Sequence, residues 1–88
     1  METNELSIVI TTFKSELKIF DCLDAIPSNI KIIIVENSNN QFFKEDIEKK
    51  YKNVNCILTG ENKGYAKANN IGLSSIHTKF ALILNPDT

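Results

Sequence analysis

The sequence predicts an α/β protein built on a three-layer, Rossmann-like parallel sheet of about four strands. Short apolar, β-branched runs alternate with segments of helical periodicity along the 88 residues, in the order βαβαβαβ. The runs at residues 6–13 and 30–35 are almost uniformly apolar, which is typical of strands that helices cover on both faces. Such alternation requires parallel strands joined by right-handed helical crossovers.

Apolar periodicity and turn residues place four strands and three helices. The strands are expected at residues 6–13, 30–35, 54–58 and 80–84. The helices are expected at residues 15–26, 42–51 and 65–77. The predicted strand order is 3-2-1-4, and 2-1-3-4 is the alternative. In the first order the topological switch lies between the first and fourth strands, and ligands bind beyond the carboxyl ends of strands at such a switch.

Length, charge and cysteine spacing exclude several classes of protein. A chain of 88 residues allows one domain, residues 1–88, and a net charge of -1 gives no basic footprint for nucleic acid. The apolar runs are too short to span a bilayer, and no signal-like stretch follows Met1. Cys22 and Cys56 match no metal spacing and are expected to be free thiols. We therefore expect a cytoplasmic protein, with a position at the inner face of a membrane as a further option.

Polar residues end three of the expected strands on the same edge of the sheet. Thr12 lies near the end of the first strand, Glu36 directly follows the second and Asp87 follows the fourth. A carboxylate in the position of Glu36 can accept hydrogen bonds from a ribose or a base. The alternative is a solvated carboxylate that begins a turn. The following residues 37–40, which read "NSNN", are expected to form a loop.

The turn after the first strand does not bind phosphate in the usual way. It reads "TTFKSE" and contains no glycine, and the chain has no Gly-Lys-Ser/Thr phosphate loop. A phosphorylated ligand therefore needs another partner, such as Mg²⁺ or Mn²⁺ held by Asp87. Turn formation after Pro86 is the alternative role for this aspartate. Lys63 and Lys67 flank a helix start, where they favour an anion or are simply solvated.

The stretch "GENKGYAKANNIGL" carries two adjacent asparagines with different expected roles. A helical wheel places Tyr65 on the face that packs on the sheet, Asn69 in the middle of that face and Asn70 well off it. Gly72 lies on the same inward face and allows a close approach to the sheet. A buried amide needs hydrogen-bond partners. Asn69 is therefore expected to tie down strand ends or the preceding loop, with direct ligand contact as the alternative.

These stretches together resemble the amino-terminal half of a family 2, GT-A-type glycosyltransferase, most like the rhamnosyltransferase-like branch. "LSIVITTFKS" is similar to the opening strand, and "IIIVENSNN" to the second strand with its nucleotide-contacting acid. "ENKGYAKANNIGL" followed by "FALILNPDT" is similar to the helix and metal-motif strand, and this pair is the most specific part. The likeness covers nearly the whole chain after Asn4.

The resemblance implies a nucleotide-diphosphate-sugar donor, a divalent cation (Mg²⁺ or Mn²⁺) and an acceptor such as a polysaccharide or a lipid-linked glycan. Cell-wall or polysaccharide biosynthesis is the corresponding process. The implied metal ligand is Asp87, although Asn85-Pro86-Asp87 offers one carboxylate where an Asp-x-Asp motif is common. The implied nucleotide-sugar-binding residues are Thr12, Glu36, Asn62, Lys67, Asn70 and Asp87.

Enzymes of this kind place the acceptor site and the catalytic base after the metal motif, and nothing follows Thr88 here. The resemblance therefore implies a donor-binding half that has no catalytic residue of its own and is inactive alone. Two other functions stay open: another nucleotide-binding enzyme, such as a nucleotidyltransferase, and a non-enzymatic α/β interaction module. The fourth strand, "FALIL", is expected at a sheet edge, so we also expect self-association there.

Overall fold

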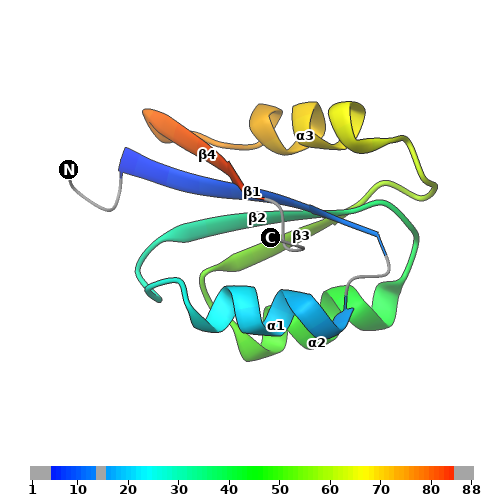
Figure 1. Cartoon of the computed structure of the whole chain (residues 1–88), viewed down its shortest axis with the longest axis horizontal. Coiled ribbons are helices and arrows are strands. Elements are labelled where there is room, and N and C mark those ends of the chain that lie inside the picture. Colours follow the sequence, from blue (N-terminus) through cyan, green and yellow to red (C-terminus); the bar gives the residue numbers. More distant parts are fainter. Residues whose placement is uncertain (1–4, 14–15, 85–88) are drawn as a thin grey trace.

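The computed structural model describes residues 5–13 and 16–84, which form a parallel sheet with helices on both faces (Figure 1). The strands are β1 (Leu6–Thr12), β2 (Lys31–Glu36), β3 (Val54–Leu58) and β4 (Phe80–Leu84). The helices are α1 (Glu16–Asp24), α2 (Gln41–Lys50) and α3 (Tyr65–Ser74). The strand order is β3-β2-β1-β4, with every pair parallel. The predicted fold class and the first of the two strand orders are confirmed.

Side chains alternate along β1 and β2, and this alternation creates two cores. One set packs against α1 and α2, and the other packs against α3 on the opposite face (Figure 1). The larger core contains Ile8, Ile10, Ile19, Leu23, Ile32, Ile34, Phe43, Ile47, Val54 and Cys56. The smaller core contains Val9, Ile33, Val35 and Ala68. Burial of apolar side chains on both faces explains why these strands read as continuous apolar runs.

Helix α3 packs closely on β1 and β2 because Gly72 has no side chain. A Cβ atom at this position would lie 2.5 Å from Val9 Cγ1 and 3.0 Å from Val35 Cγ2. Real Cβ atoms do not approach other carbon atoms so closely. The predicted role of Gly72 in close helix–sheet packing is confirmed.

Two details of α3 differ from the prediction. The helix ends at Ser74, three residues before the expected end, and the Ser74 and Ser75 hydroxyls donate to the carbonyls of Asn70 and Ile71. Such back-bonding competes with continued helix. Tyr65 is 52% exposed although the wheel placed it inward. Side chains of a helix lean toward its N-terminus, so the first residue reaches past the helix instead of onto the sheet.

The two edges of the sheet differ in how they are covered. At the β3 edge, Cys56 N–H donates to Glu48 Oε2 at 2.7 Å, and Lys44 Nζ donates to the Cys56 carbonyl. Burial raises the pKa of the Glu48 carboxyl, but the Cys56 N–H and the Lys44 ammonium outweigh it and leave that pKa lowered. The side chains of α2 thus occupy both backbone groups of Cys56, which lie in the middle of this edge, and hinder the addition of a strand there.

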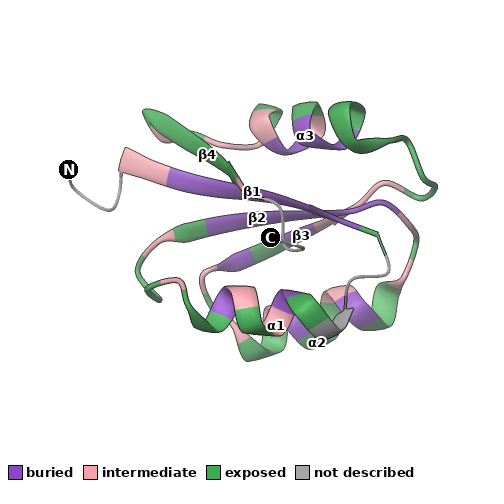
Figure 2. Cartoon of the chain, viewed as in Figure 1, coloured by how far each residue is buried: buried purple, intermediate pink, exposed green. Residues whose placement is uncertain are grey.

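The other edge, β4, lies open within the described part of the chain. It pairs there with β1 alone, and Figure 2 shows it as exposed where β1 is buried. Phe80, Leu82 and Ile83 keep 45%, 48% and 41% of their surface exposed. The predicted open edge is confirmed for these residues. None of the described helices has the length and apolar character needed to cross a membrane.

Candidate functional site

A buried carboxylate joins the carboxyl ends of β1 and β2. Thr12 and Glu36 lie opposite each other in the strand register, and Thr12 Oγ1 donates to Glu36 Oε1 at 2.6 Å. The Ser38 hydroxyl donates to the other oxygen, Glu36 Oε2. Glu36 is 1% exposed, so both hydroxyls replace water around the charged group. The structure thus brings together Thr12 and Glu36, two of the predicted site residues. It adds Ser38, which was not predicted. Its position two residues after the carboxylate at the end of a strand could have indicated this role.

Backbone hydrogen bonds continue past the strand ends and hold three chain segments together. Asn37 N–H donates to the Thr12 carbonyl at 2.8 Å. Thr59 N–H donates to the Glu36 carbonyl at 3.1 Å. The end of β1, the end of β2 and the loop after β3 therefore form one connected edge.

The side chain of Asn37 was missed by the sequence reasoning, which treated residues 37–40 as turn material. Its Oδ1 atom accepts from Lys63 N–H at 3.2 Å and lies 3.1 Å from Thr59 Oγ1, whose hydroxyl is closer to the Glu61 carbonyl. Its Nδ2 atom donates to the Gly64 carbonyl at 3.2 Å. The residue is 3% exposed. One buried amide thus connects β2 to the loop that leads into α3. In the sequence, the position of Asn37 directly after a buried strand could have indicated this role.

The loop of residues 60–64 contains two glycines in the left-handed backbone region. Gly60 has φ 88° and Gly64 has φ 86°, conformations that other residues adopt only at a cost. Asn62 Oδ1 accepts from Gly64 N–H at 3.0 Å. Gly64 is the N-cap residue of α3, and because it has no side chain it makes no capping hydrogen bond to the helix. The N-terminus of α3 lies at the same edge as the carboxyl ends of β1 and β2 (Figure 1). Anionic groups are stabilised at such a helix end.

Asn69 lies under α3 as the helical wheel predicted. It is 7% exposed, and its Oδ1 accepts from Thr11 Oγ1 at 2.6 Å. Thr11 is itself buried at 8% exposure. This pair attaches the helix to the end of β1, so the expected structural role of the buried amide is confirmed.

Replacing Asn69 with leucine is expected to lower the free energy of unfolding by about 1–3 kcal/mol, because the buried Thr11 hydroxyl loses its acceptor. Asn70→Leu, at the adjacent exposed position, is the matched control and should stay within about 0.5 kcal/mol of the parent. Urea unfolding followed by circular dichroism measures both. A midpoint for Asn69→Leu equal to that of the parent would contradict the role of the pair.

The remaining predicted site residues are spread over the loop and the outer side of α3. Asn62, Lys67 and Asn70 are exposed, and within the described part of the chain no hydrogen bond links them to Thr12 or Glu36. The predicted metal ligand, Asp87, lies outside the described residues. Among residues 5–13 and 16–84, no three His, Cys, Asp or Glu side chains gather to hold a metal ion.

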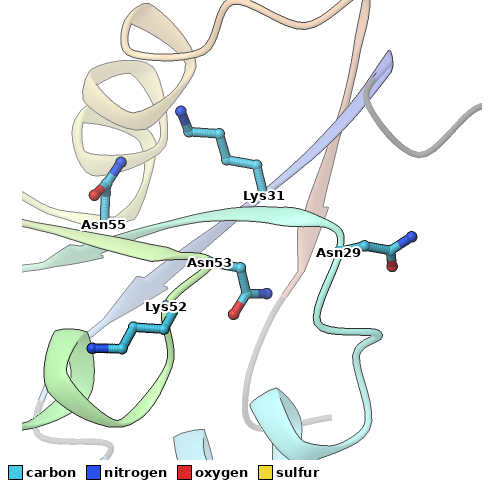
Figure 3. A pocket seen from close by; sticks show the side chains of 5 residues that line it. All are labelled: Asn29, Lys31, Lys52, Asn53 and Asn55. Carbon is cyan, nitrogen blue, oxygen red and sulfur yellow. The ribbon is translucent and has the colours of Figure 1, made fainter.

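A separate polar hollow of about 260 Å³ lies at the amino ends of β2 and β3 (Figure 3). It is lined by Asn29, Lys31, Lys52, Asn53 and Asn55. In Figure 3 these side chains extend in different directions and do not converge. Asn53 Nδ2 donates to the Ile30 carbonyl at 2.7 Å, which explains its orientation. We therefore place the candidate site at the carboxyl edge.

Comparison with known proteins identifies related sequences. The sequence profile described as "Glycosyl transferase family 2" matches residues 7–88. A low-salt glycan biosynthesis hexosyltransferase, Agl10, from Haloferax volcanii is 30% identical over 96% of this chain and 28% of its own length. A teichoic acid poly(glycerol phosphate) polymerase from Staphylococcus epidermidis is 32% identical over 96% of this chain and 13% of its own length.

Solved structures show the same fold. Residues 1–349 of TarS from S. aureus match with a TM-score of 0.75 at 17% identity, over 94% of this chain and 27% of that one. TarS 1–349 in complex with UDP matches with a TM-score of 0.77 at 22% identity and the same coverage. This chain thus spans about a quarter of the length of the matched TarS structures and of the matched hexosyltransferase.

Proposed function

Because this chain belongs to glycosyl transferase family 2, we propose that residues 1–88 form the nucleotide-sugar-binding half of a GT-A glycosyltransferase domain. The enzyme would transfer a sugar from a nucleotide-diphosphate-sugar to an acceptor such as a polysaccharide or a lipid-linked glycan. The observation that carries the proposal is the cluster of Thr12, Glu36 and Ser38 at the carboxyl edge of the sheet. In open α/β sheets this edge is where ligands bind.

The geometry supports a division of roles within this site. The buried Glu36 carboxylate fixes the hydroxyls of Thr12 and Ser38, and these polar groups suit a ribose or a base. The N-terminus of α3, with Lys67 in its first turn, suits the diphosphate. Asn62 and Asn70 are proposed to line the sugar side of the site.

We propose Asp87 as the ligand of a Mg²⁺ or Mn²⁺ ion, which would neutralise the diphosphate. The basis is the sequence: the chain lacks the glycine-rich turn that would otherwise bind phosphates. Removal of the metal with EDTA should then weaken nucleotide binding by the parent chain. Asp87→Asn should lose this dependence on Mg²⁺, and affinity that is insensitive to Mg²⁺ in the parent would contradict the proposed ligand.

Titration of the purified chain with UDP, TDP and ADP in an isothermal calorimeter tests the nucleotide site. UDP is the first probe because the structural neighbour TarS was solved with it. The proposed function predicts measurable binding of UDP or TDP and weaker binding of ADP. Equal binding of all three points to a less selective nucleotide-binding enzyme, and binding of none supports a non-enzymatic interaction module.

We propose that the catalytic base and the acceptor site lie in the part of the related proteins that this chain does not match. A general base must lie within hydrogen-bonding reach of the acceptor hydroxyl. The purified 88-residue chain is therefore expected to bind donor without transferring sugar. Transfer above a blank without enzyme, measured with radiolabelled UDP-sugars, would contradict this assignment.

We also propose that the 88-residue chain self-associates through the open β4 edge. Lys44 and Glu48 occupy the backbone groups of Cys56 at the β3 edge, which favours strand addition at β4. Ile83→Lys, in the exposed part of β4, should shift the chain toward monomer because a charge opposes edge pairing. Light scattering after size exclusion at high micromolar concentration measures this, with Asn55→Lys in β3 as the control. A parent that stays monomeric would refute the proposal.

A further inference from the structure

We infer that Asn37 is a positioning residue that fixes the loop of residues 59–64 against the end of β2. This inference rests on the proposed function in one respect, namely that the loop borders the nucleotide-sugar site. The side chain of Asn37 would act through the loop, because its Oδ1 accepts from Lys63 N–H and its Nδ2 donates to the Gly64 carbonyl.

The anchor on the β2 side is rigid. Asn37 follows β2 directly, and its N–H donates to the Thr12 carbonyl at 2.8 Å. Its backbone is therefore held by the end of β1, and β1 and β2 are almost fully buried. A side chain mounted on this backbone has little freedom to follow the loop if the loop moves.

The side chain of Asn37 contacts the far end of the loop, at residues 63 and 64. The backbone hydrogen bonds to the end of β2 reach only the near end, at residues 59 and 60. The near end is held by Thr59 N–H to the Glu36 carbonyl and by Gly60 N–H to the Ser38 carbonyl. In the described part of the chain, Asn37 bonds Lys63 N–H and the Gly64 carbonyl, and that carbonyl also accepts from Ala68 N–H of α3 at 3.1 Å. The far end is thus joined to β2 by the Asn37 amide, while Gly64 is also held by the first turn of α3.

The other contacts within the loop hold its shape but do not attach it to the sheet. Lys63 Nζ lies 3.3 Å from Glu61 Oε1, and Asn62 Oδ1 accepts from Gly64 N–H. Both contacts join residues two positions apart. Residues 60–64 are all exposed, so apolar packing adds little to their attachment.

Loss of the amide would release residues 61–63 from β2, although Gly64 would keep its bond to α3. Ordering the released backbone again on ligand binding costs conformational entropy, so even partial release lowers affinity. We expect Asn37→Ala to weaken UDP binding at least tenfold and to speed hydrogen exchange at the amides of residues 61–64. The sheet amides should keep their relative order of protection.

Asn53→Ala is the matched control. Asn53 is also a partly buried amide that bonds a backbone carbonyl, that of Ile30, but it lies at the opposite end of the strands. Both variants and the parent are compared by hydrogen-exchange mass spectrometry, urea unfolding and UDP titration. Asn53→Ala should lower stability without changing exchange in residues 61–64, and its UDP affinity should stay within twofold of the parent.

Two results would overturn the inference. One is unchanged exchange of residues 61–64 in Asn37→Ala. The other is an equal loss of UDP affinity in Asn53→Ala, which would show that stability alone controls binding. If the parent itself binds no UDP, the proposed function fails, but the exchange experiment still decides whether Asn37 fixes the loop.

Discussion

Gly72→Leu is expected to destabilise the chain by about 3 kcal/mol or more, as overpacking of a tight core costs 1–3 kcal/mol and the clash here is severe. Already at its first atom, the new side chain would lie 2.5 Å from Val9 Cγ1 and 3.0 Å from Val35 Cγ2. Both valines are fully buried in β-strands and have little rotamer freedom. Helix α3 would have to move away from β1 and β2, which also separates Asn69 from Thr11.

The comparison variants for this change are Gly72→Ala and Ala66→Leu. Gly72→Ala introduces the clash of the Cβ atom but gains roughly 1 kcal/mol of helix propensity, so its loss should be smaller. Ala66 is exposed on α3, where leucine has room. Urea unfolding ranks the three variants, and a Gly72→Leu midpoint near that of the parent would contradict the close packing of α3.

Glu36→Ala is expected to lower the free energy of unfolding by about 3 kcal/mol, since each hydroxyl that loses a buried acceptor costs about 1–3 kcal/mol. The hydroxyls concerned belong to Thr12 and Ser38. Relief from holding a buried charge offsets part of this loss. On the proposed function, UDP affinity should also fall more than tenfold, because the same hydroxyls then lose their fixed orientation.

Two variants separate these effects. Glu36→Gln keeps the shape and one acceptor oxygen, so it should retain more stability than Glu36→Ala. Glu45→Ala removes an exposed carboxylate of α2 and should change neither stability nor UDP affinity. Unfolding midpoints and calorimetric titrations measure all three. A Glu36→Ala chain with parental UDP affinity would remove Glu36 from the site.

The fold was predictable from sequence because buried parallel strands leave a strong pattern. The continuous apolar runs around Val9 and Ile33 and the helical spacing of Phe43 and Ile47 specify each element with little ambiguity. Element ends were less certain. The end of α3 depends on two serine hydroxyls that return to the backbone, and apolar periodicity does not record such bonds.

The candidate site was predictable in part. Strand-end chemistry places Thr12 and Glu36 on one edge, and the helical wheel places Asn69 inward. The amide network of Asn37 was not predictable, because its partners lie 22 to 27 residues away on a loop of irregular backbone. Local pattern gives no information on contacts between such loops.

Chemical-shift mapping of the isotope-labelled chain with UDP tests the central claim most directly, namely that the carboxyl edge of this sheet is a nucleotide site. The account predicts shift changes at the amides of Thr12, at residues 36–38 and 60–67, with little change at Lys31 and Lys52 at the opposite end. Changes centred on Lys31 and Lys52, or no changes at saturating UDP, would contradict it.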